Sequence, residues 1–394
     1  MLNSKFILED NTDVFPGYLD KEQRKNLRDR YAGRKQFLRC GCKPNGDLWY
    51  KISEDLKIYP EHNNYKHDLL CSRYQDEDGK KHRQTAYVID DESGNVTTYL
   101  SFDAKEFSLD ETTEREKDNE VPDELEDMEE IIIEKSDEIK PDTRKTEPKL
   151  SLKGLIRSIN VDTFTEKILT GKTIASAEQF SKMVYYRMQK VGFSKSKRAI
   201  GELTLEKDGV RFFYLPFAGS FMEESKGYKK CYVQTKGADG NIYRNFTYPE
   251  VLETALQTYA EQYGTEPNSN TMIAGFQYLK KSRSGSYRVL GRIHLFEVSD
   301  LGLYCNSMVE QETFNALHKI AQESKDTKFW IPPEDASIGA FIQVKGYDKK
   351  LLLLFRGAKT QRVAFDPAAY VPLLVEEGMQ LTEEVLREVL ENYE

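Results

Sequence analysis

Apolar residues recur at every second position in several short runs before residue 103, which is the spacing of a β-strand with one buried face. The predicted strands are 47–52, 56–59, 85–89 and 96–102. The last two flank the turn sequence Asp-Asp-Glu-Ser-Gly-Asn and are predicted to form a hairpin. Asp20 is predicted to cap a short, mostly charged helix. The pattern therefore predicts a small β-rich module at the start of the chain.

The pattern changes at Leu150, where apolar residues begin to recur every three or four positions. Two helices are predicted over 152–169 and 177–191, followed by a hairpin of strands 202–205 and 210–215 around Lys-Asp-Gly. Helix, helix and hairpin is the order of elements in a winged helix. We therefore expect the larger part of the chain to begin with a winged-helix-like unit.

Beyond residue 215, strands and helices are predicted in an irregular order. Basic residues from Lys280 onward occupy the turn of one long hairpin, and Thr382 is predicted to cap the last helix. The predicted strands are 230–234, 242–246, 270–278, 287–298, 303–308, 328–331, 340–344 and 350–355, and the predicted helices are 249–263, 309–322 and 382–393. The fold class predicted for the chain is α+β.

Length and charge divide the chain into parts. A length of 394 residues with 39% apolar content allows a sizeable core and favours two domains. Residues 103–149 carry 8 basic and 19 acidic side chains, whereas the flanking regions are close to neutral. Such a segment cannot offset its ordering entropy, so we predict a disordered, flexible acidic linker, in which Ile131 to Ile133 can dock as a short helix. The predicted domains are therefore 1–102 and 150–394, with the linker over 103–149.

The chain shows no segment expected to enter a membrane. No apolar run approaches the 18 or more residues of a membrane span, and the first ten residues lack the apolar core of a secretory signal. The five cysteines are an odd number in a large chain, which favours a reducing compartment. We therefore expect a cytoplasmic protein without a membrane partner.

Three of the five cysteines lie close to a histidine in the first module. Tetrahedral Zn²⁺ sites take four nitrogen or sulfur ligands, often as two close pairs, and the predicted pairs here are Cys40 with Cys42 and His67 with Cys71. His62 is a competing ligand. The alternative is that these cysteines are ordinary reduced thiols. A zinc ion would supply folding free energy that so small a β-rich module lacks.

Two regions combine positive charge with a predicted helix. Around 182–198, basic residues alternate with aromatic ones, and the predicted nucleic-acid contacts are Lys190, Lys195, Lys197 and Arg198. A second basic run extends from Lys21 to Arg39. It has two interpretations: a phosphate-contacting face, or a solvated helix with acidic residues interleaved, which we favour.

One catalytic hypothesis concerns the end of the chain. Nucleases of the restriction-endonuclease-like class hold Mg²⁺ with carboxylates and place a lysine beside the attacking water. The nearest matches are Glu310 or Glu312, Glu334 with Asp335, and Gln343 with Lys345. Gln343 replaces a needed acid, so we expect the C-terminal part to end in a degenerate version of this fold and lean against an enzyme.

The Cys-x-Cys and His-x-x-x-Cys pairs, the sequence Leu-Ser-Leu-Lys-Gly-Leu-Ile from Leu150, and the stretch Ile338 to Phe355 resemble an uncharacterised bacterial family associated with conjugative plasmids and integrative elements. The resemblance implies a mobile-element context and no activity. We therefore expect a zinc-containing, non-catalytic nucleic-acid-binding or accessory protein, with DNA and other mobile-element proteins as partners. The alternatives are a Mg²⁺-dependent nuclease and a protein-binding scaffold.

Overall fold

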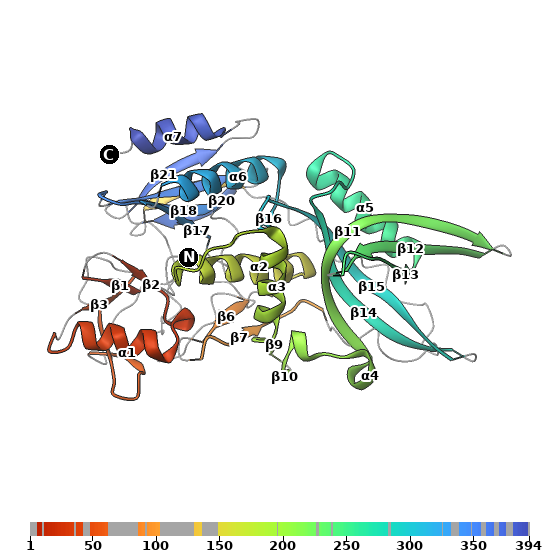
Figure 1. Ribbon diagram of the computed structural model, residues 1–394, viewed down its shortest axis with the longest axis horizontal. Coiled ribbons are helices and arrows are strands. Elements are labelled where there is room, and N and C mark those ends of the chain that lie inside the picture. Colours follow the sequence, from red (N-terminus) through yellow and green to blue (C-terminus); the bar gives the residue numbers. More distant parts are fainter. Residues whose placement is uncertain are drawn as a thin grey trace.

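The computed structural model contains both helices and sheets, which confirms the mixed α+β class. Figure 1 shows helices α2 (Leu152–Leu169) and α3 (Ala177–Met188) in the middle of the molecule, with the N-terminal elements, a C-terminal sheet and a set of long strands around them. The structure describes residues 6–9, 12–34, 37–41, 48–61, 86–90, 93–102, 130–135, 149–194, 196–225, 228–237, 239–282, 285–324, 326–331, 339–347, 349–355, 360–365, 370–375 and 381–392.

The N-terminal elements form a sheet with the strand order β2-β1-β3-β4-β5. The predicted helix is present, because the Asp20 side chain accepts from the Gln23 backbone at 2.8 Å and the Gln23 side chain accepts from the Asp20 backbone at 3.0 Å. Phe6, Leu38 and Tyr50 centre a separate apolar cluster. The elements are β1 (Phe6–Leu8), β2 (Asp13–Val14), η1 (Pro16–Tyr18), α1 (Lys21–Arg30), β3 (Leu38–Cys40), β4 (Trp49–Ile52) and β5 (Ile58–Pro60).

A second sheet joins residues from both sides of the predicted linker. Its strands are β6 (Tyr87–Ile89), β7 (Val96–Thr98), β9 (Val191–Phe193) and β10 (Ser196–Ala199). The predicted hairpin of β6 and β7 is confirmed, and β7 pairs in parallel with β9. The domain boundaries at residues 102 and 150 stay a prediction. The segment 103–149 lies outside the described residues, except for 130–135 and Lys149.

A buried ion pair ties these elements to the central helices. Asp162 of α2 accepts from the hydroxyls of Tyr18 and Tyr87, each at 2.6 Å, and from Arg187 Nε of α3 at 2.5 Å. Burial alone would lower the pKa of Arg187, but the charges of Asp162, Tyr87, Tyr18 and Glu166 together outweigh burial and leave that pKa raised. A buried charge pair of this kind is costly to break from one side only, because the remaining charge is left unpaired.

The hairpin predicted over 202–215 is wrong. Residues 200–208 instead form the 3-10 turn η3 (Ile200–Glu202) and the short helix α4 (Leu205–Asp208). The Thr204 side chain caps α4 by accepting from the Lys207 backbone at 3.4 Å, and Gly209 ends it with φ of 70°. The Lys-Asp-Gly sequence is thus the end of a helix rather than a hairpin turn.

Five long strands after α4 close into a barrel among the described residues. β11 (Val210–Ser225) pairs antiparallel with β12 (Tyr228–Lys236) and β14 (Thr271–Ser282). β12 pairs with β13 (Ile242–Thr247), and β14 pairs with β15 (Gly285–Val298). The closure is a parallel contact of β13 with β15 at Thr247 and Leu290, where the Thr247 hydroxyl donates to the Leu290 carbonyl at 2.8 Å.

Helix α5 (Pro249–Tyr263) connects β13 to β14 and packs against the barrel. Its bounds are those predicted from the sequence, with a proline in the first turn and Gly264 in the left-handed conformation at the end. Leu252 and Tyr259 of α5 join Val233, Ile273 and Leu290 in the barrel interior. The predicted long hairpin of β14 and β15 is confirmed.

The C-terminal part is a four-stranded sheet among the described residues, in the order β17-β18-β19-β21. The predicted hairpin of β18 and β19 and the Thr382 helix cap are confirmed. Residues 131–133 lie in a strand paired with β20, so the short helix predicted there is wrong. The elements are β8 (Glu130–Lys135), β16 (Tyr304–Cys305), α6 (Met308–Glu323), β17 (Thr327–Trp330), β18 (Ala340–Val344), β19 (Lys350–Phe355), β20 (Thr360–Phe365), β21 (Tyr370–Val375) and α7 (Glu383–Glu391). No helix in the described ranges has the length and apolar character needed to cross a bilayer.

Candidate nucleic-acid interface

Strand β11 changes partners along its length, and a bulge marks the place. Residues 210–216 pair with β14, and residues 217–225 pair with β12. The pairing register shifts between Phe217 and Gly219, and Gly219 has φ of 122°, which residues with a side chain rarely adopt. The bulge bends β11 around the barrel, so its second half lies with β12 and β13 away from α2.

A row of aromatic rings crosses the outer face of these three strands. Phe221, Tyr232 and Phe246 stand opposite one another on β11, β12 and β13. The rings of Phe221 and Tyr232 are stacked with centroids 5.3 Å apart, and Tyr232 meets Phe246 edge to face at 6.1 Å. All three side chains are partly exposed. On β12 and β13, their neighbours Val233 and Thr247 are buried and point into the barrel, whereas Met222 beside Phe221 on β11 is exposed.

Two tyrosines extend the row toward β15. Phe246 packs edge to face against Tyr248 at 5.7 Å and against Tyr287 of β15 at 6.2 Å. The hydroxyls of Tyr248 and Tyr287 are 3.5 Å apart, and both side chains are partly exposed. We call Phe221, Tyr232, Phe246, Tyr248 and Tyr287 together the ring row.

Cations border the ring row. The Arg244 guanidinium lies over the Phe221 ring, 5.0 Å from its centroid, and its side chain is 64% exposed. Its ion pair with Glu223 is long, at 3.7 Å, and exposed, so it constrains Arg244 weakly. Lys230 and Lys236 of β12 are also exposed. A cation beside stacked rings is suited to a ligand that combines flat groups with negative charge.

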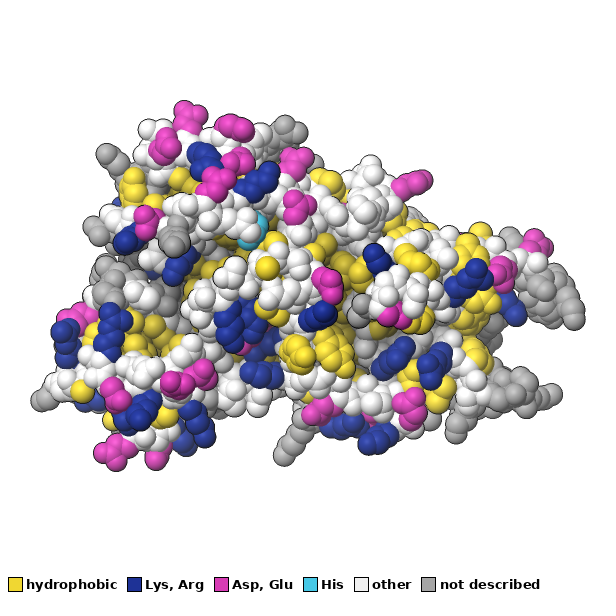
Figure 2. All heavy atoms as spheres, viewed as in Figure 1, with side chains coloured by type: hydrophobic (Ala, Val, Ile, Leu, Met, Phe, Trp, Pro, Cys, Tyr) yellow, Lys and Arg dark blue, Asp and Glu magenta, His cyan; other side chains and the backbone are white. Residues whose placement is uncertain are grey.

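The hairpin of β14 and β15 adds further positive charge to the barrel. Residues 280–288 contain four basic and no acidic side chains. Arg288 is exposed near Arg211 of β11, and burial together with the charge of Arg288 lowers the pKa of Arg211. Glu206 of α4 pairs with Arg288 at 3.8 Å. Figure 2 shows yellow and dark-blue side chains next to one another on the right of the molecule, where Figure 1 draws the long strands.

The predicted nucleic-acid contacts lie elsewhere. Lys190 is exposed just after α3, and Arg198 of β10 is exposed but engaged by Asp208 and by the Glu202 carbonyl. Lys195 and the side chain of Lys197 lie outside the described residues. Two exposed rings, Tyr185 and Tyr186 of α3, are close in sequence to Lys190, whereas the barrel carries five neighbouring rings in the ring row.

The predicted zinc ligands fall mostly outside the described residues. Cys42, His67 and Cys71 lie there, as does the competing His62. Cys40 is described: it ends β3, is fully buried and belongs to the apolar cluster of Phe6 and Tyr50. This environment favours the alternative interpretation for Cys40, a buried thiol with apolar neighbours. In the described part of the chain, His, Cys, Asp and Glu side chains form no group of three that could hold a metal.

The nuclease residues do not converge in the described part of the chain. Glu310, in the first turn of α6, is buried and bonded to Asn306, and burial raises its pKa. Lys345 is 81% exposed and pairs at 3.5 Å with Asp326, beyond the other end of α6. A helix of this length spans roughly 22 Å, so Glu310 and Lys345 are far apart. Glu312 is exposed, Gln343 lies on β18, and Glu334 with Asp335 lies outside the described residues.

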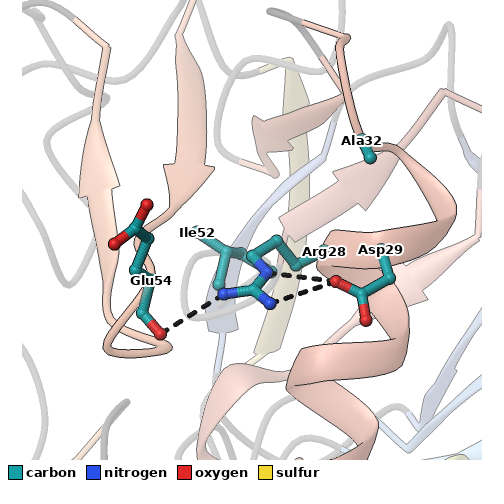
Figure 3. Close-up of a pocket in the computed structure, with 5 residues that line it drawn as sticks. All are labelled: Arg28, Asp29, Ala32, Ile52 and Glu54. Carbon is teal, nitrogen blue, oxygen red and sulfur yellow. Dashed lines mark hydrogen bonds and ion pairs between the residues drawn. The ribbon is translucent and has the colours of Figure 1, made fainter.

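Two arginines of the basic run from Lys21 to Arg39 have structural roles, while Lys21, Lys25, Arg30 and Arg34 are exposed. Arg24 is buried and donates to the carbonyls of Pro16 at 2.8 Å and Leu56 at 3.3 Å. Arg28 lines a surface hollow of about 550 Å³ between α1 and the turn after β4, where it bonds Asp29 at 3.1 Å and the Glu54 carbonyl at 3.3 Å (Figure 3). Since these partners occupy the guanidinium groups, the hollow has little free charge to offer a ligand.

No family model matches this chain, and no curated protein and no solved structure matches it.

The ring row was not predicted from the sequence, although strands 230–234 and 242–246 and the basic hairpin were. The available signal is that Tyr232, Phe246 and Tyr287 each lie in a strand that also carries basic residues, Lys230 and Lys236, Arg244, and Arg288 respectively. Their juxtaposition depends on the register between strands, which the sequence pattern does not specify.

Proposed function

We propose that this protein binds single-stranded nucleic acid, without cleaving it, on the open face of the barrel. The observation that carries the proposal is the ring row, which runs across β11, β12, β13 and β15 with Arg244 beside it. Unpaired bases stack on aromatic side chains, while cations follow the phosphates of the same strand. A duplex buries its base faces and cannot use the rings in this way.

The connectivity of the barrel supports this function. The first strand, β11, pairs with the second and the fourth, the third pairs in parallel with the fifth, and a helix connects the third to the fourth. This is the connectivity of the oligonucleotide- and oligosaccharide-binding barrel. Barrels of that kind bind ligands on the face of their second and third strands and on the loops joining strands one to two and four to five. The ring row occupies the same face here.

Charge favours a nucleic acid over a neutral sugar. The β14–β15 hairpin has four basic and no acidic residues over 280–288, and Arg244, Lys230 and Lys236 border the rings. A polyanion releases counterions from such a surface, which a neutral oligosaccharide does not. The analogy of fold alone does not distinguish a nucleic acid from an oligosaccharide as the ligand. The basic residues beside the ring row favour the nucleic acid.

Two parts of the expected function remain as proposals beside this one. The proposed zinc site of Cys40, Cys42, His67 and Cys71 involves no residue of the barrel. Measuring the zinc content of the purified protein tests this site. The mobile-element context and its protein partners rest on resemblance. A nuclease is less favoured, because Glu310 and Lys345 lie at opposite ends of α6.

The test compares binding of oligothymidylate and of duplex DNA by fluorescence anisotropy, using the wild-type chain and Tyr232→Ala. We expect tighter binding of the single strand, and a roughly ten- to hundredfold loss in Tyr232→Ala, because one stacked base contributes about 1–3 kcal/mol. Tyr59→Ala is the matched control, since Tyr59 is a tyrosine 44% exposed on β5, far along the chain from the barrel. Duplex preferred over single strand, or wild-type affinity in Tyr232→Ala, would contradict the proposal.

A further inference from the structure

Helix α3 presents two adjacent tyrosines to solvent. Tyr185 is 56% exposed and Tyr186 is 71% exposed, with ring centroids 6.4 Å apart. Tyr186 is the most exposed large hydrophobic side chain in the described part of the chain. Of the eight such exposed side chains there, five belong to α3, β11 or β13, including Met222, Ile242 and Tyr243. Exposed apolar side chains that gather in one region mark a binding surface.

The tyrosines lie on the same side of α3 as two lysines. Lys182, Tyr185, Tyr186 and Lys190 are spaced three or four residues apart, which places them on one face of the helix and its end, and all four are exposed. Lys182 bonds Glu178 at 2.8 Å in an exposed pair, which leaves the ammonium accessible to a second anion. This face thus repeats the combination of rings and cations found on the barrel.

Helix α3 lies beside the barrel, and its first turn is close to the end of β12. Helix α3 packs against β11. The hydrogen bond and charge of Lys182 lower the pKa of Glu178, and the charge of Lys236 at the end of β12 acts in the same direction. Lys236 therefore lies within electrostatic range of the first turn of α3. Tyr185 follows Glu178 by seven residues, roughly 11 Å along the helix. Figure 2 shows hydrophobic side chains beside basic ones between the positions of α3 and α4 in Figure 1.

We propose that a single-stranded nucleic acid bound on the barrel continues past Lys236 onto α3, where two of its bases stack on Tyr185 and Tyr186. This inference rests on the proposed function and extends the binding site to a second platform. The barrel then holds one part of the strand, and Lys182 and Lys190 contact the phosphates of the part that leaves it. A partner protein would instead need a dry apolar centre, whereas these two rings are flanked by lysines on the same helix face.

The test uses two oligothymidylates, one of about six and one of about sixteen nucleotides, which bracket the site sizes of such barrels. The double variant Tyr185→Ala/Tyr186→Ala should bind the longer strand about tenfold more weakly and the shorter strand as the wild type does. Tyr232→Ala should weaken both strands, because both need the barrel. Since Tyr185 and Tyr186 are exposed, their replacement should leave the midpoint of urea denaturation as in the wild type.

Four results would overturn the inference. If the double variant binds both strands as the wild type does, the strand does not reach α3. If it loses affinity equally for both, α3 belongs to the primary site rather than to an extension. If the wild type binds neither oligothymidylate, the proposed function fails together with its extension onto α3. If the wild type binds the short and the long oligothymidylate with equal affinity, only the extension onto α3 is refuted. Ultraviolet crosslinking of thymines to residues 177–190 gives an independent positive readout.

Discussion

The barrel has two outer faces, both formed by the alternation of inward- and outward-pointing side chains along its strands. The outward-pointing aromatic rings of the two faces differ in how far they are buried. On one face, Phe276 and Phe296 are fully buried, and Phe212 packs on Phe276 with ring centroids 5.2 Å apart. On the other, Phe221 and Tyr232 stack at a similar distance, 5.3 Å, but stay partly exposed. The covered face packs against α2, Phe102 and β16. Phe246, Tyr248 and Tyr287 touch the edge of the same apolar cluster, whereas Phe221 and Tyr232 belong to none of the apolar clusters among the described residues. Both faces thus carry packed aromatic rings, and the elements that cover one of them make the difference.

The largest effect should separate the two faces by stability. Phe276→Ala removes a ring buried on the covered face and is expected to lower the free energy of unfolding by about 3–5 kcal/mol. Phe246→Ala removes a partly exposed ring and should cost less than about 2 kcal/mol, because part of that ring already contacts water. Urea denaturation of both variants measures the difference.

The same two variants should show the reverse order in binding. Phe246→Ala is expected to weaken oligothymidylate binding roughly tenfold, since it removes the centre of the ring row. At a temperature where Phe276→Ala remains folded, that variant should bind as the wild type does. Equal stability losses in the two variants would mean that the open face is covered in solution, and the comparison would fail.

The sequence predicted the elements of the barrel far better than its closure. Helix α5 has the predicted bounds because local signals, Pro249 at its start and Gly264 at its end, determine them. Strands β12 to β15 were predicted because their alternation is strong. The parallel contact of Thr247 with Leu290 was not, since it joins residues 43 positions apart with no local signal. The ring row follows from that closure and from the strand register, and so it also escaped prediction.

Arg187 shows that a basic and aromatic composition does not by itself identify the residues that can contact a ligand. It lies in the basic and aromatic region that was predicted to contact nucleic acid, yet it is buried and bonded to Asp162. Tyr185 and Tyr186, from the same helix, are exposed. A helix places neighbours on different faces, and only the packing of α3 against the rest of the chain decides which side chains remain available.

Lowering the pH should reduce the free energy of unfolding through His294 on the covered face, by an amount between the effects of Phe276→Ala and Arg244→Gln. His294 of β15 lies beside Phe296 and Tyr304, with its Nε2 atom 3.1 Å from the Tyr304 hydroxyl. Burial, with a smaller effect from the charge of Lys153, lowers the pKa of His294 from 6.5 to about 3. The unfolded chain therefore binds a proton that the folded chain does not between these two values. Stability is fully present above pH 6.5 and declines as pH falls toward 3.

The expected loss between pH 7 and pH 5 is about 2 kcal/mol from this histidine alone, at 1.36 kcal/mol for each pH unit below 6.5. Denaturation of the wild type and of His294→Gln at both pH values measures it. The variant should lose about 2 kcal/mol less than the wild type on acidification, whatever its stability at pH 7. A parallel pH dependence in the two proteins would show that His294 does not titrate in this window.

The smallest effect concerns charge at the open face. Arg244→Gln removes the cation over Phe221 and should reduce the slope of log affinity against log salt by about 0.7, the value for one lost phosphate contact on a single strand. Arg198→Gln is the matched control, because Arg198 is exposed yet already engaged by Asp208 and the Glu202 carbonyl. Anisotropy titrations at several salt concentrations measure both slopes. The opposite result, an unchanged slope in Arg244→Gln and a reduced slope in Arg198→Gln, would contradict the proposal. It would mean that the phosphates contact the predicted surface of Lys190, Lys195, Lys197 and Arg198 instead of the barrel. The open face of the barrel would then bind another kind of ligand.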